Sequence, residues 1–135
     1  MSYGIGVRLD EPFAACVPRV RAALAEQGFG ILTEIDIRAT LRAKLGIDGP
    51  DHLILGACNP PLAHRALTAD PDIALLLPCN VVVRADGPDR TLVQALDPQI
   101  MVRVAAADGL PEVAEEAATR LRAALAALTA GAPAG

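Results

Sequence analysis

Aromatic residues are scarce in this chain of 135 residues, which has no tryptophan, one tyrosine and two phenylalanines. Rings are the surfaces on which bases and flat cofactors stack, so the composition offers few stacking platforms. Positive charge is also in short supply: the formal net charge is -4, and Lys44 is the only lysine. Because an acidic chain repels a phosphate backbone, we expect no nucleic-acid partner.

Long hydrophobic runs are absent as well, and we expect no leader segment. The apolar stretches, such as Ile73 to Pro78, fall far short of the roughly 20 residues that cross a bilayer, so we expect no membrane association. The first ten residues lack a basic stretch followed by an apolar run, and the three cysteines are an odd number. These features predict a protein of the reducing cytoplasm.

Motifs for nucleophilic attack and for phosphate binding are missing too. Ser2 is the only serine, which excludes a serine nucleophile on a strand-to-helix elbow. The pairs Gly4-x-Gly6 and Gly28-x-Gly30 lack the third glycine of a dinucleotide-binding fingerprint. The sequence therefore favours a binding role over an enzymatic one.

The spacing of apolar residues predicts a mixture of strands and helices. Alternation and β-branched residues indicate strands, and spacings of three and four indicate helices. Asp10, Asp36 and Asn59 are suited to cap the helices that follow them. Residues 99–104 are expected to extend the last strand or to form another one, and residues 73–77 form a short buried segment of open type. The expected strands are 3–9, 28–35, 52–57, 80–85 and 91–96, and the expected helices lie within 10–28, 36–46, 60–69 and 111–128.

This order of elements predicts one α+β domain over residues 1–128, followed by a disordered tail over residues 129–135. We expect a mainly antiparallel sheet with helices packed on one face, of ferredoxin-like flavour. A one-faced sheet leaves its edges and often a second face uncovered, and small domains commonly cover these surfaces by dimerising. The predicted assembly is therefore a homodimer.

Two Cys-Asn dipeptides, Cys58-Asn59 and Cys79-Asn80, lie at expected strand ends. With His64 one turn into the following helix, the two cysteines can form a site for zinc or copper(I), which prefer sulfur and nitrogen ligands. If their strands are parallel, the cysteines lie at opposite rims of the sheet, on the order of 20 Å apart. If the strands are antiparallel, which the double segment between them favours, the cysteines share a rim.

Other interpretations of these residues are open. A free cysteine is usually a small buried hydrophobe, and this interpretation is favoured for Cys58 and Cys79. Cys58, near a helix N-terminus, can alternatively be a redox or nucleophilic thiol, since the helix dipole stabilises a thiolate. Glu34 and Asp36 can bind a ligand or a cation. Asp36 is already explained as a helix cap, whereas Glu34 ends an apolar strand, where burial would raise its pKa.

Three segments resemble the motifs of a bacterial and archaeal family, domain of unknown function 302: residues 28–36 (GFGILTEID), 54–60 (ILGACNP) and 76–83 (LLPCNVVV). The resemblance spans nearly the whole chain. It implies a small α+β domain that stands alone and forms a dimer, with no established activity. A site shared with that family would draw on the matching positions Glu34, Asp36, Cys58, Asn59, Pro60, Leu62, Ala63, Ala66, Leu67, Pro78, Cys79 and Asn80.

The sequence leaves three functions open. The first is a domain that binds a small ligand or a soft metal ion at a strand-end site drawn from Glu34, Asp36, Cys58, Asn59, Cys79 and Asn80. The second is a structural or protein-interaction dimer, and the third is a thiol-dependent redox enzyme. Binding ranks first and enzyme last because no candidate site contains a clear catalytic base.

Overall fold

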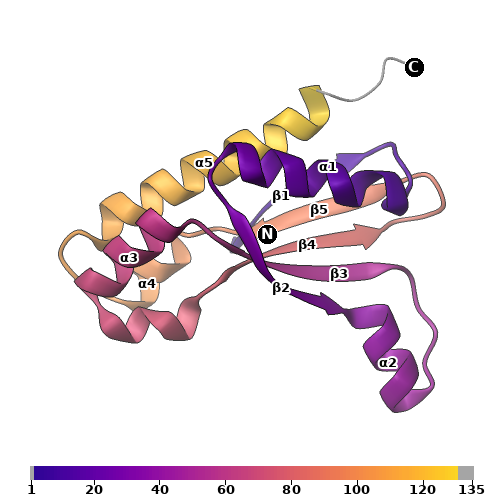
Figure 1. Ribbon diagram of the computed structural model, residues 1–135, viewed down its shortest axis with the longest axis horizontal. Coiled ribbons are helices and arrows are strands. Elements are labelled where there is room, and N and C mark those ends of the chain that lie inside the picture. Colours follow the sequence, from indigo (N-terminus) through magenta and orange to yellow (C-terminus); the bar gives the residue numbers. More distant parts are fainter. Residues whose placement is uncertain (1, 131–135) are drawn as a thin grey trace.

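Helices separate the first strands of the chain, and a meander of strands then leads to a long last helix (Figure 1). The computed structural model describes residues 2–130. The strands are β1 (Gly4–Leu9), β2 (Gly30–Asp36), β3 (His52–Cys58), β4 (Cys79–Ala85) and β5 (Thr91–Leu96). The helices are α1 (Phe13–Glu26), α2 (Ile37–Leu45), α3 (Pro60–Ala69), the 3-10 helix η1 (Pro71–Leu76), α4 (Ile100–Val104) and α5 (Leu110–Ala130).

The strands within residues 2–130 pair in the order β1-β5-β4-β3-β2, and every pair is antiparallel. The expected α+β class with an antiparallel sheet is therefore confirmed. The chain leaves β1 at one edge, crosses the sheet through α1 and enters β2 at the other edge. Strands β2 to β5 then return as a meander, so this strand order differs from the split βαβ order of a ferredoxin-like sheet.

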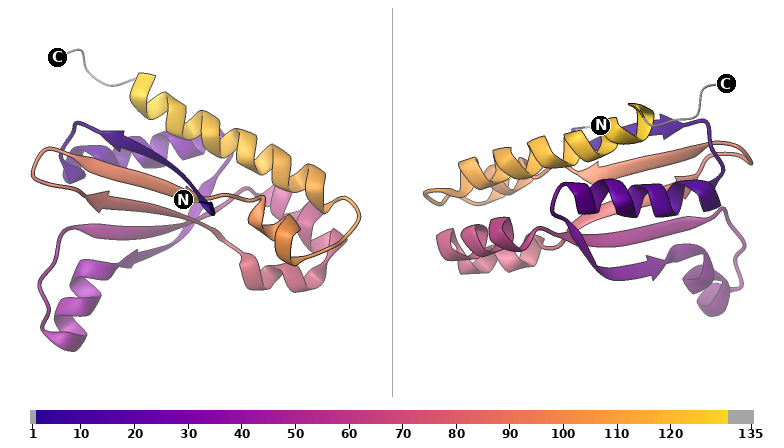
Figure 2. Two further views of the ribbon diagram at one scale, coloured as in Figure 1. Left: turned by 180° about the vertical axis from the view of Figure 1, so that it is seen from behind. Right: turned by 45° about the horizontal axis from the view of Figure 1, so that its top comes forward.

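Helices α1 and α5 lie side by side over one face of the sheet (Figure 2). Strand β4 alternates accordingly: Val81 and Val83 are fully buried below the helices, whereas Asn80 and Arg84 project from the uncovered face. The apolar residues between helices and sheet form what we call the filled core. Its buried members are Leu9, Cys16, Val20, Leu24, Phe29, Leu55, Ala57, Val81, Val83, Val93, Ala95, Leu121, Ala124, Leu125 and Leu128.

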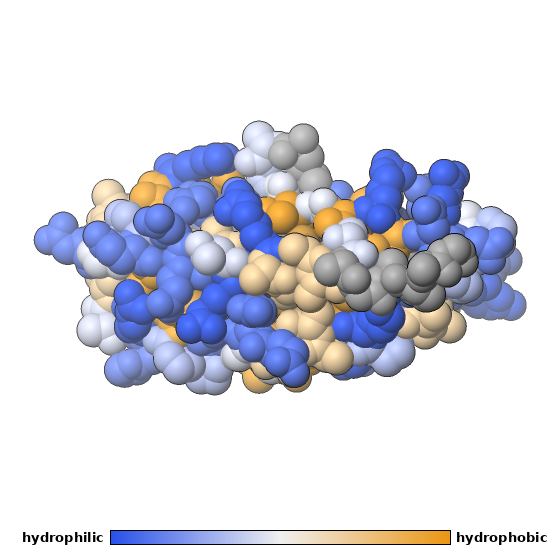
Figure 3. Space-filling view, turned by 90° about the horizontal axis from the view of Figure 1, so that it is seen from above, coloured by the Kyte–Doolittle hydropathy of each residue, from blue (hydrophilic) through white to orange (hydrophobic). Residues whose placement is uncertain are grey.

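A second apolar cluster lies beyond one end of the strands, where α3, η1 and α4 gather beside the first half of α5 (Figures 1 and 2). We call it the end cluster. Helix α5 thus belongs to both clusters. Seen from the side of α5, the surface is largely hydrophilic, with smaller hydrophobic areas between (Figure 3). The buried members of the end cluster are Leu62, Ala66, Ile73, Met101, Leu110, Val113, Ala114 and Ala117.

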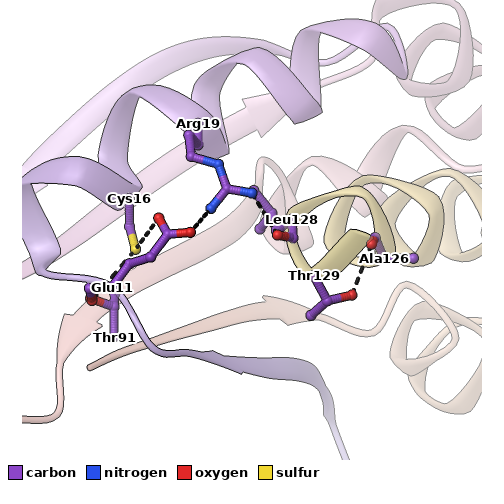
Figure 4. Close-up of polar contacts among 7 residues, drawn as sticks. All are labelled: Glu11, Cys16, Arg19, Thr91, Ala126, Leu128 and Thr129. Carbon is purple, nitrogen blue, oxygen red and sulfur yellow. Dashed lines mark hydrogen bonds and ion pairs between the residues drawn. The ribbon is translucent and has the colours of Figure 1, made fainter. Parts of the chain in front are cut away.

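A polar contact group fastens the far end of α5 to the start of α1 (Figure 4). Glu11, only 9% exposed, forms an ion pair with Arg19, whose guanidinium also donates to the Leu128 carbonyl at 2.5 Å. Carbonyls in the last turn of a helix lack an intrahelical donor, so this bond satisfies one of them. The Glu11 carbonyl accepts from the Thr91 hydroxyl at 2.8 Å. Burial, the largest cause, raises the pKa of the Cys16 thiol beside this carboxylate.

Several local expectations are corrected by the structure. Residues 99–104 enter helix α4 and not a strand, because Pro98 leads the chain out of β5 and Asp97 Oδ1 accepts from the Gln99 N–H at 3.0 Å. Asp10 does not cap α1, since the N-cap position is Pro12. The open segment at 73–77 is largely helix η1. Helix α5 continues to Ala130, and the rest of the expected tail, 131–135, lies outside the described residues.

Helix α2 projects from the β2 edge of the sheet, away from the other helices (Figure 1). Its predicted ends are confirmed: Asp36 Oδ1 accepts from the Ala39 N–H at 2.9 Å, and Gly46 closes the helix at a φ of 66°. None of its residues is buried. As to the membrane, no helix within residues 2–130 combines the length and hydrophobicity of a bilayer span.

Candidate functional site

A cavity of about 300 Å³ opens between the sheet end and the end cluster. It lies where β3 ends, where β4 begins and where α3 and the first half of α5 face each other. Leu32 and Leu67, which are 67% and 37% exposed, lie on its solvent side. Its lining consists of Phe29, Leu32, Ala57, Cys58, Asn59, Leu62, Ala63, Ala66, Leu67, Leu77, Pro78, Cys79, Met101, Val113 and Ala117.

Small side chains make the cavity. Ala57 of β3, Ala63 and Ala66 of α3, and Ala117 of α5 face the same space from three elements. A leucine at one of these positions would fill part of that space, since each added methylene occupies it. The empty volume is therefore a direct result of where the sequence places alanine.

Close approach of the backbone at Gly56 shapes one wall. A Cβ atom at this position would lie 2.1 Å from Thr33 Oγ1 and 2.9 Å from Pro78 Cγ. Thr33 is the residue that pairs with Gly56 across the β2–β3 ladder, and Pro78 follows a cis peptide bond and lines the cavity. Only glycine allows β2 and Pro78 to approach β3 this closely.

Cys58 and Cys79 share a rim of the sheet, as the antiparallel alternative requires. Strands β3 and β4 are antiparallel, Cys79 is the register partner of Ala57, and both cysteines line the cavity. Burial raises the pKa of the Cys79 thiol to about 11, and the nearby Cys58 adds to the increase. At neutral pH the Cys79 thiol is therefore protonated, which makes it a poor nucleophile because the thiolate is the attacking form.

Asn59 has a structural role at the cavity wall. Its Oδ1 accepts from the Leu62 N–H at 3.3 Å, which confirms the predicted cap of α3. Its Nδ2 donates to the Gln27 carbonyl at 3.3 Å. The same nitrogen would lie 3.0 Å from a Cβ atom at Gly28, a residue whose φ is 83°. The amide thus joins the end of α1 to the start of α3, and these two bonds use one of its N–H groups and one acceptor position of its oxygen.

The other predicted site residues lie elsewhere. Glu34 is on the β2 edge, 46% exposed and paired with Arg21 at 2.6 Å, so its expected burial is wrong. Asp36 caps α2, and Asn80 projects from the uncovered face of the sheet. His64 borders a separate shallow depression between α3 and α5. Within residues 2–130, no three His, Cys, Asp or Glu side chains gather in a way that could hold a metal ion.

Sequence reasoning missed the apolar wall of the site, because a set of alanines carries no chemical signal by itself. One signal was present: Leu62, Ala63, Ala66, Leu67 and Pro78 all match the family pattern, and all line the cavity. These positions would have pointed to α3 as a wall of the site. The dipeptides pointed to the correct rim but also to Asn80, which faces the opposite side.

Comparison with known proteins bears on the whole chain. The family model Domain of unknown function DUF302 matches residues 5–128. The chain belongs to this family. The crystal structure of an uncharacterised conserved DUF302 protein from Bacillus stearothermophilus is similar, with a TM-score of 0.84 and 27% sequence identity over 93% of this chain and 98% of that chain. No curated protein matches the chain.

Proposed function

We propose that this DUF302 domain binds a small, uncharged, largely apolar molecule in the cavity beside Cys58 and Cys79. The observation that carries the proposal is an apolar cavity of about 300 Å³ in a small domain. Protein interiors are normally close-packed, and voids larger than a water molecule are few. Ligand pockets, in contrast, are mostly apolar and begin near this size.

The lining limits the chemistry of the ligand. No charged side chain is among the described residues that line the cavity, and the Asn59 amide is already hydrogen-bonded. A charged ligand would lose its hydration without compensation there. At about 30 Å³ for each water-sized group, the volume accepts roughly ten such groups. Two thiols at the rim add polarizable, weakly hydrogen-bonding contacts.

The test uses the neutral fluorescent probe indole, which has about nine non-hydrogen atoms and therefore matches this volume, and the chain has no tryptophan to interfere. We expect saturable binding with one site per chain. Ala66→Leu should weaken this binding by about tenfold or more because the new side chain fills the cavity, whereas Ala39→Leu on exposed α2 should not. Urea unfolding of each variant checks that it is folded, and Ala63→Leu, at a less buried wall position, provides a second filled cavity. Binding that is unchanged in folded, filled variants would contradict the proposal.

A soft metal ion is a second candidate occupant, favoured by the two unpaired thiols on one rim. Copper(I) accepts few, soft ligands, and two thiolates suit it better than they suit tetrahedral zinc, which needs four donors. His64 lies outside the cavity and is not needed for this arrangement. Native mass spectrometry with added copper(I) or zinc should show one ion per chain that Cys58→Ser and Cys79→Ser both remove. A metal that both variants retain would exclude these cysteines.

The three unpaired cysteines also support a reducing compartment such as the cytoplasm. A thiol-dependent redox role remains the third hypothesis and rests on Cys58 alone, because the Cys79 thiol is protonated at neutral pH. Labelling with iodoacetamide at pH 7 tests it. A single fast cysteine that Cys58→Ser abolishes would support that role, and uniformly slow labelling would contradict it.

Self-association through the β2 edge is favoured by a separate observation. Helix α2 buries none of its residues, and Leu41 and Leu45 of α2 remain exposed, as does Ile47 just after its end. An isolated nine-residue helix is marginal in water, so a covered position for α2 would stabilise it. The ion pairs Arg38–Asp51 and Arg42–Asp48 balance most of the charge there, which suits a second copy of the chain better than a strongly charged partner.

Multi-angle light scattering tests this interface. We expect a dimer that Leu45→Glu converts to monomer, because the change places a charge inside an apolar contact. The matched control is Leu75→Glu, which alters an 88% exposed leucine of η1, far from α2. A dimer that survives Leu45→Glu and a second variant, Leu41→Glu, would show that α2 is not the interface.

A further inference from the structure

The uncovered face of the sheet contains a second hollow, of about 460 Å³, opposite the helices α1 and α5. Gly4 occupies the position of β1 that points to this face, and its register partner is Leu96 of β5. Because glycine has no side chain, it leaves a gap between the neighbouring side chains on this face of the sheet. The side chains of Tyr3, Leu96, Val82 and Asn80 stand around the hollow.

One side of this hollow carries positive charge. Arg84 of β4 and His52 of β3 are direct register partners, so their side chains lie beside each other on the uncovered face. None of the described residues that line the hollow is acidic. Arg8 and Arg84 are both register partners of Leu92, so the three residues lie in one row across the sheet. Arg8, however, forms an ion pair with Asp86 at 2.5 Å. Burial lowers the pKa of His52 and Arg84 lowers it further, so Arg84 acts on this imidazole without a carboxylate to offset it.

The pKa of His52 is lowered from an ordinary value of 6.5, so at neutral pH its imidazole is uncharged and Arg84 is the positive charge beside it. Surfaces normally intersperse the two signs, and this chain, with a net charge of -4, has acidic residues to spare. An uncompensated positive rim in an acidic protein raises the local concentration of small anions.

The remaining walls combine apolar side chains with the amides of Asn80 and Gln94. Val82 and Leu96, which we call the apolar strip, are half-buried and lie diagonally across β4 and β5, and Gln94 is the register partner of Val82. The Tyr3 ring, 58% exposed, borders the same strip. Aromatic rings gain stability by offset stacking on another ring, and an apolar strip favours a flat hydrocarbon surface. The Asn80 amide adds one further hydrogen-bonding group at the edge.

We propose that this hollow binds a small organic anion of the aromatic carboxylate class. Its carboxylate lies at Arg84 and His52, where the guanidinium can form a bidentate pair. Its ring lies over Val82 and Leu96 beside Tyr3. This site is on the other side of the sheet from the cavity near Cys58, and it does not depend on the function proposed for that cavity.

The experiment titrates the protein with benzoate by NMR, and compares acetate and inorganic phosphate. We expect saturable shifts for residues 3, 52, 82, 84 and 96, with benzoate at least about tenfold tighter than acetate because only benzoate has the ring. Saturating benzoate should raise the pKa of His52, since a bound anion stabilises the imidazolium. Arg84→Gln should weaken benzoate by about tenfold or more, whereas Arg122→Gln on α5 should leave it unchanged.

Three outcomes would overturn the proposal. The first is no saturable shift with benzoate. The second is equal affinity for phosphate, acetate and benzoate, which would mean a general anion site with no role for the apolar strip. The third is unchanged benzoate affinity in folded Arg84→Gln. Tyr3→Ala gives an independent check, because it should weaken benzoate without weakening acetate.

Discussion

The two halves of helix α5 show how one helix serves two kinds of interior. Its second half contributes Leu121, Leu125 and Leu128 to the filled core against α1 and the sheet, and each is at most 3% exposed. Its first half contributes Val113 and Ala117 to the end cluster, where they border a cavity of about 300 Å³. Both halves bury apolar residues at helical spacing, so the difference lies in what faces them.

This difference separates stability from binding within one domain. In the filled core, leucine and valine side chains from α1, β3, β4 and β5 meet α5, and of its buried members Phe29 and Ala57 border the cavity. In the end cluster, alanines of α3 and α5 face each other. We therefore expect the filled core to supply most of the free energy of unfolding and the end cluster to tolerate changes of volume.

Deleting one leucine from each cluster is the strongest test of this comparison. Leu121→Ala should lower the free energy of unfolding by about 3–4 kcal/mol, because it removes a fully buried side chain and leaves a void. Leu62→Ala should cost only about 2 kcal/mol, since Leu62 already borders empty space and makes fewer contacts. Urea unfolding measures both. Equal losses would mean that the cavity does not persist in solution.

The pH dependence of the free energy of unfolding tests the burial of Cys79 beside the cavity. Its pKa is about 11 when folded and near 9.0 as an ordinary thiol, so the unfolded chain ionises first. The stabilisation is complete below about pH 9 and is lost as the pH rises towards 11, by at most about 2–3 kcal/mol. Urea unfolding at pH 8 and pH 10.5 in reductant should show the fall, and Cys79→Ala should reduce it. Cys16→Ala in the filled core controls for the other buried thiol.

The contact between Glu11 and Arg19 tests the closed end of the filled core. Arg19→Met keeps the apolar stem but leaves the Glu11 carboxylate, 11% exposed, without its partner. Breaking a buried pair costs about 3–5 kcal/mol, and the partial exposure of Arg19 reduces this to about 2 kcal/mol. Thermal unfolding measures the loss. In the double variant with Glu11→Gln the loss should be smaller than the sum of the single losses, and strict additivity would show that the ion pair contributes nothing.

Enlarging an alanine should give the smallest effect on the free energy of unfolding, and the effect should have opposite signs in the two clusters. Ala66→Val in the cavity wall should stabilise the protein by about 0.5–1 kcal/mol, because it fills space without strain. Ala124→Val, the same change in the filled core, should destabilise it by about 1 kcal/mol through overpacking. Denaturant midpoints measure the two changes, and a shared sign would remove the distinction between the clusters.

Much of the fold could be predicted from the sequence because local rules decide it. Several features depend only on residues within a few positions of each other. They are the alternation of β4, the helix caps Asp36 and Asn59, and the helix end at Gly46. Residues 99–104 were expected as a strand because their apolar run fits either type. The turn at Asp97 and Pro98 decides for a helix, and it does so through a side-chain hydrogen bond.

The candidate site was predicted only in part, for a physical reason. Cys58 and Cys79 were placed on one rim by the antiparallel alternative, and the structure agrees. Asn80, however, follows Cys79 in a strand, where successive side chains point to opposite faces. Glu34 and Asp36 are held at the β2 edge by Arg21 and by the cap of α2. The cavity itself arises from distant alanines, which no local pattern brings together.

Because β1 pairs with β5, the sheet cannot be completed until most of the chain has been synthesised. Gly4 pairs with Leu96, so a strand made first must wait until about residue 96 has emerged before it gains its neighbour. Until then Ile5, Val7 and Leu9 remain without the sheet that they later complete. Such a long-range pairing slows folding, because the chain loses loop entropy before the contact forms. The nascent chain therefore presents its first strand to chaperones and proteases for most of its synthesis.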